Sequence, residues 1–163
     1  LQHLTLYEMI QNKFVNINTK KYIFAFVRNP YDRIISVYNR SFKHINFDTF
    51  LLNVETIITN YDFANNYVDP DYEKNFPQII KNLNNCKYFI IPQYFFICNN
   101  NKKRFEKPNI HIHKYEDLTE INNKLNLNLK IHFKNNKFVL TEKQKEKIAS
   151  IYKIDFEKFG YSY

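Results

Sequence analysis

The most prominent feature of the hydropathy pattern is a continuous apolar run at residues 22–27, YIFAFV. Its β-branched and aromatic members predict a strand that is buried on both faces. Asn29-Pro30 ends the run, and proline is favoured at the first position of a helix because its missing N–H needs no partner there. We therefore expect a helix over residues 30–42. Its apolar stripe recurs at helical spacing: Tyr31, Ile34, Ile35, Tyr38 and Phe42.

Beyond this segment, the pattern predicts helices and strands in alternation. Helices are expected at residues 4–11, 47–58 and 117–125, and a last one after Thr141, which is a suitable N-cap. Short strands are expected at residues 88–91, 94–98 and 109–115, whereas residues 60–77 look irregular. There is no visible repeat or linker. The alternation predicts a single α/β domain over residues 1–163, with a central, mostly parallel sheet flanked by helices.

Glycine and cysteine counts exclude several kinds of site. The only glycine among 163 residues is Gly160, so neither a Walker P-loop nor a GxGxxG dinucleotide-binding loop is present. Cys86 and Cys98 are too few for a disulfide framework or a tetrahedral zinc cage, and either a disulfide or two free thiols fits the sequence. No apolar run reaches ~18 residues, so no membrane-spanning helix is expected.

Positive charge is unevenly distributed along the chain. The formal net charge is +8; residues 1–81 hold 9 basic and 8 acidic residues, whereas residues 82–163 hold 15 and 8. Such a basic half would attract a nucleic acid, an anionic glycan or a membrane surface. The abundance of Asn, Lys, Ile, Phe and Tyr also fits an AT-rich coding sequence, which would explain the charge by composition alone.

Candidate chemistry gathers where the apolar run meets the helix. Arg28 follows the predicted strand, and ligands of open α/β sheets collect at the carboxyl ends of strands. A guanidinium there can hold a phosphate through two parallel hydrogen bonds. Arg33, Ser36 and Arg40 share another face of the helix. With Arg28, the Ser36 hydroxyl and the Arg33 charge predict an anion site without glycine. The alternative is a structural arginine that is solvated or paired with Asp32.

This segment also resembles a known motif. Residues 26–38, FVRNPYDRIISVY, are similar to the nucleotide-binding signature of sulfotransferases that use 3′-phosphoadenosine 5′-phosphosulfate (PAPS). The resemblance implies that Arg28 and Ser36 hold the 3′-phosphate, with Arg33 as an accessory. Three later segments resemble family motifs in the same order: Pro92-Gln93, KYEDL at 114–118 and YKIDFEKFGY at 152–161.

The resemblance implies a sulfotransferase-like core, related to the P-loop nucleotidase fold. It also implies PAPS as co-substrate, no metal, and a carbohydrate hydroxyl on an anionic or neutral glycan as acceptor. The family's glycine-containing loop for the 5′-phosphosulfate does not occur in these residues. We therefore expect an amino-terminally incomplete domain. The compartment stays open between the Golgi lumen or a membrane, as in eukaryotic glycan sulfotransferases, and the cytoplasm.

The candidate catalytic base is His3. Some uronyl 2-O-sulfotransferases carry a Gly-His segment at this place, and its histidine is the base; here Gln2 replaces the glycine. A surface histidine is the alternative. Glu116 is a second candidate base, although its motif favours an orienting role. His111, His113 and His132 suggest a metal only weakly, because no carboxylate or cysteine completes a ligand set.

The sequence also allows two other functions. One is an inactive relative that keeps the 3′-phosphate site but lacks the 5′-phosphosulfate loop. The other is a basic nucleic-acid-binding protein, whose aromatic and basic residues would stack on bases and contact phosphates. No recognised nucleic-acid motif occurs, so no nucleic-acid partner is expected.

Overall fold

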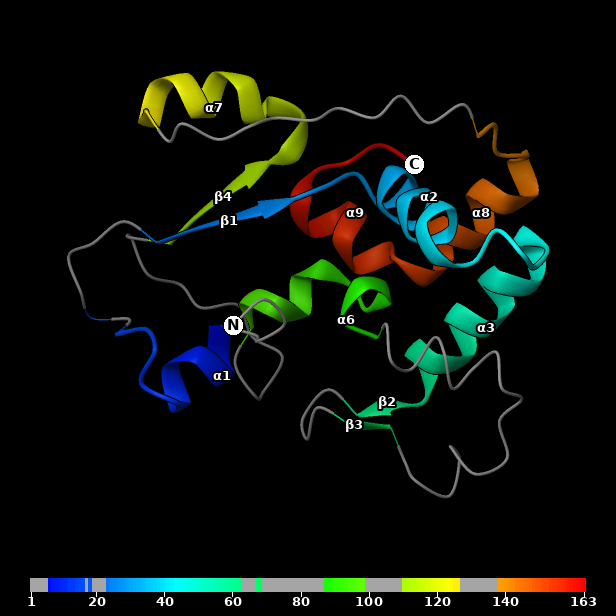
Figure 1. Cartoon of the computed structure of the whole chain (residues 1–163), viewed down its shortest axis with the longest axis horizontal. Helices are drawn as coiled ribbons and strands as arrows, with labels where there is room; N and C mark the ends of the chain where they lie inside the picture. The colour runs from blue at the N-terminus through cyan, green and yellow to red at the C-terminus, as the bar shows by residue number, and fades with distance from the viewer. Residues whose placement is uncertain are drawn as a thin grey trace.

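The computed structural model describes residues 6–16, 18, 23–62, 67–68, 87–98, 110–126 and 138–163. Within these residues the chain is mostly helical and contains a small parallel sheet (Figure 1). Strand β1 (Ile23–Val27) pairs in parallel with β4 (Ile110–Lys114), in a register that places Ile23 beside Ile110 and Val27 beside Lys114. A short antiparallel pair, β2 (Tyr61–Asp62) and β3 (Tyr67–Val68), lies apart from it. The predicted α/β class is confirmed.

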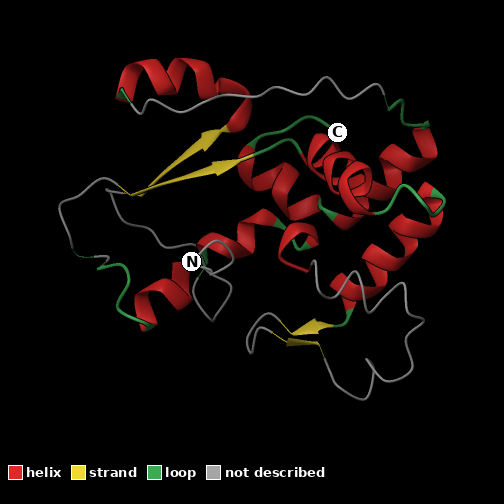
Figure 2. Cartoon of the chain, in the orientation of Figure 1, coloured by secondary structure: helices red, strands yellow, loops and turns green. Residues whose placement is uncertain are grey.

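Helices make up most of the described structure (Figure 2). The bounds of the α-helices are α1 Leu6–Gln11, α2 Pro30–Ser41, α3 Phe47–Thr59, α6 Lys87–Ile90, α7 Leu118–Leu125, α8 Glu142–Ile151 and α9 Lys153–Phe159. The described residues also contain two 3-10 helices, η1 Gln93–Ile97 and η2 Tyr115–Asp117.

Helix α2 begins as its sequence predicts. The Asn29 side chain caps it by accepting a hydrogen bond from the Tyr31 backbone N–H at 2.9 Å, and Pro30 occupies the first turn. The predicted apolar stripe is buried except for Tyr31, which is partly buried. This stripe fixes which face of α2 is left for ligands.

The main hydrophobic core joins α2, α3, α8 and α9. Ile34, Phe50, Val54, Ile148 and Phe156 are almost completely buried within it. A second, smaller cluster packs η1 and α9 against one face of the sheet, where Ala25 and Ile112 contribute side chains. These contacts hold the carboxyl end of β1 next to α2.

Two strand predictions were wrong. Residues 88–91 fall largely in helix α6, and residues 94–98 largely in the 3-10 helix η1. A short apolar run does not distinguish a buried strand from a buried helix, and here tertiary hydrogen bonds decide. The backbone N–H groups of Gln93 and Tyr94 bond the Asp155 carboxylate at 2.8 and 2.9 Å, so they do not join a sheet ladder.

The last predicted helix starts correctly but is divided. Thr141 caps α8 in a capping box with Gln144, as its sequence suggests. The helix ends at Ile151, and α9 starts at Lys153. Tyr152, between them, is buried and donates its hydroxyl hydrogen to the Ile90 carbonyl at 2.6 Å.

Candidate functional site

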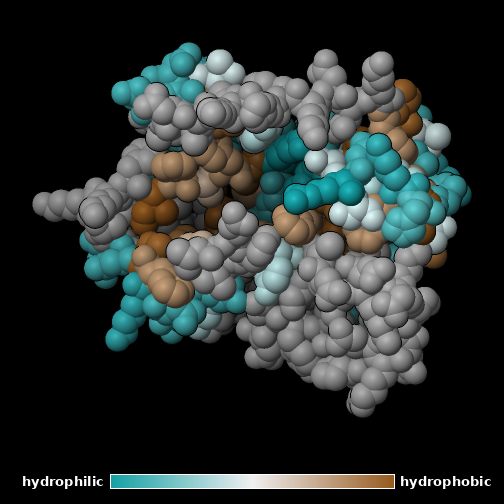
Figure 3. All heavy atoms as spheres, in the orientation of Figure 1, coloured by the Kyte–Doolittle hydropathy of each residue, from teal (hydrophilic) through white to brown (hydrophobic). Residues whose placement is uncertain are grey.

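The carboxyl end of β1 and the exposed face of α2 form a pocket of about 330 Å³. Its polar lining consists of Arg28, Arg33, Arg40, Ser36 and Ser41. Figure 3 shows hydrophilic residues over α2 beside hydrophobic residues over the sheet, with a hollow between them. Three guanidinium groups around one hollow create a positive potential that favours an anionic ligand.

Helical spacing brings the α2 residues of this pocket together. Arg33, Ser36 and Arg40 are three, four and seven positions apart, so they lie on one side of the helix, opposite the buried stripe. Arg28 joins them from the preceding loop because Asn29-Pro30 turns the chain directly from strand to helix. The structure thus brings together all three residues that the sequence assigns to the 3′-phosphate.

Two of the arginines lie over aromatic rings. The Arg28 guanidinium carbon is 5.5 Å from the centre of the Tyr115 ring, and the Arg40 guanidinium carbon is 5.9 Å from the centre of the Phe89 ring. Phe89 is itself partly exposed and lines the pocket. Such cation–π contacts restrict the arginine rotamers while they leave the N–H groups available for a ligand.

Arg33 lies deeper than the other two arginines. Its Nη2 atom donates to the Tyr88 carbonyl at 3.4 Å, and the residue is only partly exposed. Burial lowers the pKa of Arg33, and the nearby Tyr152 and Asp155 oppose this shift. An arginine remains charged in any case, so Arg33 supplies positive charge at the base of the pocket.

A second hollow of about 230 Å³ adjoins the first, since Arg33 and Phe89 line both. Its other lining residues come from β1 and from the α6–η1 segment, and most of them are apolar. An apolar hollow beside an arginine pocket suits a ligand with an anionic group and a flat, less polar part.

The loop that carries Arg28 is held by side chains from distant segments. The Gln93 side chain accepts a hydrogen bond from the Arg28 N–H at 2.9 Å and donates one to the Arg28 carbonyl at 2.7 Å. Next along the loop, the Asn29 N–H donates to the Glu116 Oε1 atom at 2.8 Å.

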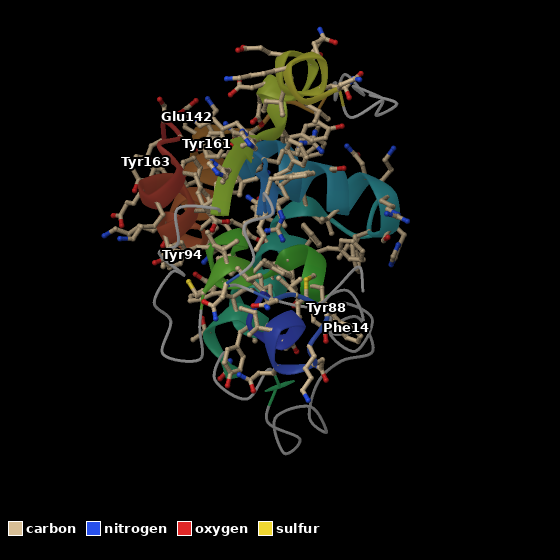
Figure 4. All side chains as sticks on the ribbon, turned by 90° about the vertical axis from the view of Figure 1, so that its left-hand side faces the viewer. Phe14, Tyr88, Tyr94, Glu142, Tyr161 and Tyr163 are labelled. Carbon is tan, nitrogen blue, oxygen red and sulfur yellow. The ribbon has the colours of Figure 1, made fainter. Side chains whose placement is uncertain are left out.

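Tyr161 holds the residue that precedes Arg28. Its hydroxyl lies 3.2 Å from the Val27 carbonyl oxygen and 2.9 Å from the Glu116 Oε2 atom. Burial raises the pKa of Tyr161, and the Glu116 carboxylate adds to the shift. In the stick view Tyr161 lies beside β4, and its ring is 4.5 Å from the Lys114 Nζ atom (Figure 4).

These contacts bear on the candidate base Glu116. Both of its carboxylate oxygens accept hydrogen bonds from the fold, one from Asn29 and one from Tyr161. A carboxylate so engaged orients the loop, which agrees with the interpretation of its motif. His3 lies outside the described residues, and so do His132 and Cys86.

The other chemistry-bearing residues lie apart from the arginine pocket lining. The rings of His111 and His113 are stacked on β4, with 6.4 Å between their centres, and His113 is 6.0 Å from the Phe26 ring. Among the described residues there is no group of three side chains suited to hold a metal. The buried Cys98 Sγ atom donates to the Tyr94 carbonyl at 3.1 Å. No described helix is long and apolar enough to cross a membrane.

Comparison with known protein families identifies the family to which this chain belongs. The sequence profile described as "Sulfotransferase family" matches residues 2–162, nearly the whole chain. The chain belongs to the sulfotransferase family. No curated protein and no solved structure matches it significantly.

The three later sequence motifs that resemble those of the sulfotransferase family supply residues that hold the loop around Arg28. In this sulfotransferase, the Pro-Gln, Tyr-Glu-Asp and Phe-Gly-Tyr segments supply Gln93, Glu116 and Tyr161, which all bond the loop around Arg28. The motif resemblance was the only signal for these roles in the sequence. Arg40 and Phe89 also line the pocket, and neither was assigned to the site from sequence.

Proposed function

We propose that this sulfotransferase moves a sulfuryl group from PAPS to a hydroxyl of a carbohydrate or glycan acceptor. Arg28 and Ser36 bind the 3′-phosphate of the nucleotide, and Arg33 adds positive charge below it. The observation that carries this proposal is the arginine- and serine-lined pocket at the carboxyl end of β1, in a chain of the sulfotransferase family.

The chemistry of the pocket supports a phosphate ligand in particular. A phosphate monoester carries about two negative charges and three acceptor oxygens, which suit a forked guanidinium and a hydroxyl donor. The adjoining apolar hollow is compatible with the nucleoside part of the same ligand. Holding PAPS by its 3′-phosphate positions the distant sulfuryl group for in-line attack by the acceptor hydroxyl.

Transfer also requires a base that takes the proton of the acceptor hydroxyl, together with positive groups near the leaving phosphate. His3 remains the proposed base. A histidine suits this role because its pKa lies near neutrality. The glycan acceptor is supported by the Pro92-Gln93 motif, which resembles one in carbohydrate sulfotransferases, and by the basic character of the chain.

The first prediction concerns Arg28. In Arg28→Ala we expect affinity for adenosine 3′,5′-bisphosphate, measured by calorimetry, to fall roughly 10- to 100-fold, because a charge-assisted, two-point contact is lost. Lys143→Ala is the matched control: it removes one positive charge from an exposed position on α8, away from the pocket lining. Equal affinity in wild type and Arg28→Ala would contradict the proposed site.

A second candidate function is an inactive relative that keeps the 3′-phosphate site, whose donors the arginine pocket supplies. It predicts bisphosphate binding without transfer. Incubation with sulfur-labelled PAPS and a panel of glycans separates the two, because labelled glycan excludes an inactive protein. Binding that depends on Arg28 without transfer to any glycan would favour the inactive relative.

A further inference from the structure

The Gln93 side chain forms hydrogen bonds with both backbone polar groups of Arg28. Its amide accepts from the Arg28 N–H at 2.9 Å and donates to the Arg28 carbonyl at 2.7 Å. These are the two bonds that a neighbouring strand would make with this residue. A single side chain thus extends the pairing of β1 by one residue, at the point where the strand ends.

Gln93 is in turn held by the C-terminal part of the chain. Its backbone N–H donates to one oxygen of Asp155 and the Tyr94 N–H donates to the other, at 2.8 and 2.9 Å. Asp155 is completely buried, and Tyr152 bonds the Ile90 carbonyl just before this turn. The start of η1 therefore has little freedom to move relative to α9.

The consequence for Arg28 is geometric. Hydrogen bonds to both its N–H and its carbonyl fix the backbone on either side of the Cα atom, and so fix the direction of the Cα–Cβ bond. That direction sends the guanidinium over Tyr115 and to the pocket shared with Ser36. Gln93 lines the adjoining hollow and is absent from the arginine pocket lining.

We infer that Gln93 is a positioning residue, which sets the affinity of the arginine pocket for phosphate through the backbone of Arg28. This inference rests on the proposed function, since it assumes that Arg28 binds the 3′-phosphate. The position requires one donor and one acceptor at the end of a side chain of this length. Glutamine supplies both at every pH, whereas a carboxyl group of the same shape supplies both only when it is protonated.

Because only the carboxyl group loses its donor when it ionises, Gln93→Glu distinguishes a hydrogen-bonding role of Gln93 from a general packing role. In Gln93→Glu, the ionised carboxylate accepts from the Arg28 N–H but repels the Arg28 carbonyl. We expect affinity for adenosine 3′,5′-bisphosphate to be roughly tenfold below wild type at about pH 8, the effect of about one hydrogen bond. As the pH falls to about 4 and below, past the ordinary glutamic acid pKa of about 4.3, the carboxyl group takes up a proton, and the ratio to wild type should rise toward one.

The ratio to wild type isolates the substituted side chain. Among the described residues, Arg28, Arg33 of α2 and Asp155 of α9 are charged groups at this position, and α1, which packs against η1, carries Glu8. All of them are present in both proteins. Titration of the ligand phosphates also cancels in the ratio. Gln93→Ala serves as a second variant and should show a loss of affinity that does not change with pH.

Each outcome of the experiment is decisive. Wild-type affinity in both Gln93 variants, with weakened binding in Arg28→Ala, overturns the positioning role and leaves the proposed function in place. A loss in Gln93→Glu that is constant with pH also overturns it, because that loss would come from packing. Wild-type affinity in Arg28→Ala removes the proposed function, and the positioning role with it. Urea unfolding of each variant shows over which pH range the comparison concerns folded protein.

Discussion

Buried polar side chains of this protein hold its turns in place through hydrogen bonds to backbone groups. Among the described residues, Tyr152 is the largest side chain that is almost fully buried, and its hydroxyl donates to the Ile90 carbonyl at 2.6 Å. Burial raises the pKa of Tyr152 well above its usual value, because a phenolate would lose its hydration in the core; Arg33 opposes this shift. The hydrogen bond from Tyr152 to the Ile90 carbonyl therefore requires the protonated phenol.

Removal of this hydroxyl gives a prediction with a defined pH dependence. Tyr152→Phe leaves the Ile90 carbonyl without this donor, so we expect a loss of about 1–2 kcal/mol in the free energy of unfolding at neutral pH. Since the folded pKa is raised, the wild-type contribution is complete below the unfolded pKa of about 10 and is lost as the pH rises beyond it. Urea unfolding from about pH 8 to 11 should show wild type losing stability more steeply than Tyr152→Phe.

Tyr163→Phe is the matched control for this experiment. Tyr163 is 66% exposed, and its ring stacks on Phe156, so removal of its hydroxyl should change the free energy of unfolding at neutral pH by less than about 0.5 kcal/mol. Parallel stability curves for wild type and Tyr152→Phe above about pH 10 would refute the assigned role of the buried phenol.

At the scale of elements, the 3-10 helix η1 connects helix α9 to the end of strand β1 through hydrogen bonds. Asp155 of α9 accepts two backbone hydrogen bonds at the start of η1, and the Gln93 side chain of η1 bonds the end of β1. Burial raises the pKa of Asp155, while Arg33 and these backbone N–H groups oppose the shift. Asp155 thus determines that residues 93–97 form a 3-10 helix at this place.

A substitution at Asp155 tests this connection. Asp155→Asn replaces one acceptor by an NH₂ group that faces a backbone N–H, so we expect a loss of about 2 kcal/mol in the free energy of unfolding. Asp117→Asn is the matched control, because Asp117 is exposed and makes no side-chain capping bond at the start of α7; its effect should stay within about 0.5 kcal/mol. Urea denaturation measures both, and similar losses in the two variants would argue against the capping role.

For the whole molecule, net charge and site charge have different origins. The chain carries +8, mostly in residues 82–163, whereas Arg28, Arg33 and Arg40 belong to the nearly neutral first half. The arginine pocket is therefore a local arrangement, and the overall charge adds long-range attraction for any polyanion.

Because the pocket charge and the overall charge lie in different parts of the chain, we expect Arg28→Ala to affect the binding of oligonucleotides and of adenosine 3′,5′-bisphosphate differently. Single-stranded oligonucleotides should bind no more tightly than nonspecific partners do, with dissociation constants of roughly 10⁻⁴ to 10⁻⁶ M at physiological salt, and Arg28→Ala should not change that affinity. The same variant should weaken adenosine 3′,5′-bisphosphate binding. Fluorescence anisotropy with a labelled oligonucleotide, at about 50 and 200 mM salt, measures the first part. Much tighter oligonucleotide binding that Arg28→Ala weakens would favour the nucleic-acid alternative.

Local patterns were sufficient to predict α2 and the residues that it presents. The Asn29-Pro30 signal, the stripe from Ile34 to Phe42 and the opposite face with Arg33 and Ser36 all follow from helical periodicity and capping. These features depend on residues a few positions apart, which interact in the same way in any fold. The family resemblance added the expected phosphate ligand.

The residues that support the pocket depend on contacts between distant parts of the chain. Gln93 is 65 positions from Arg28, and Glu116 is 87 positions from Asn29. Periodicity carries no information about such pairs, so the sequence by itself determined the strand–helix unit and the charges of the pocket. Only the tertiary structure decided that residues 88–98 are largely helical and that Gln93 extends β1, because buried backbone groups must bond whichever partner the packed fold brings to them.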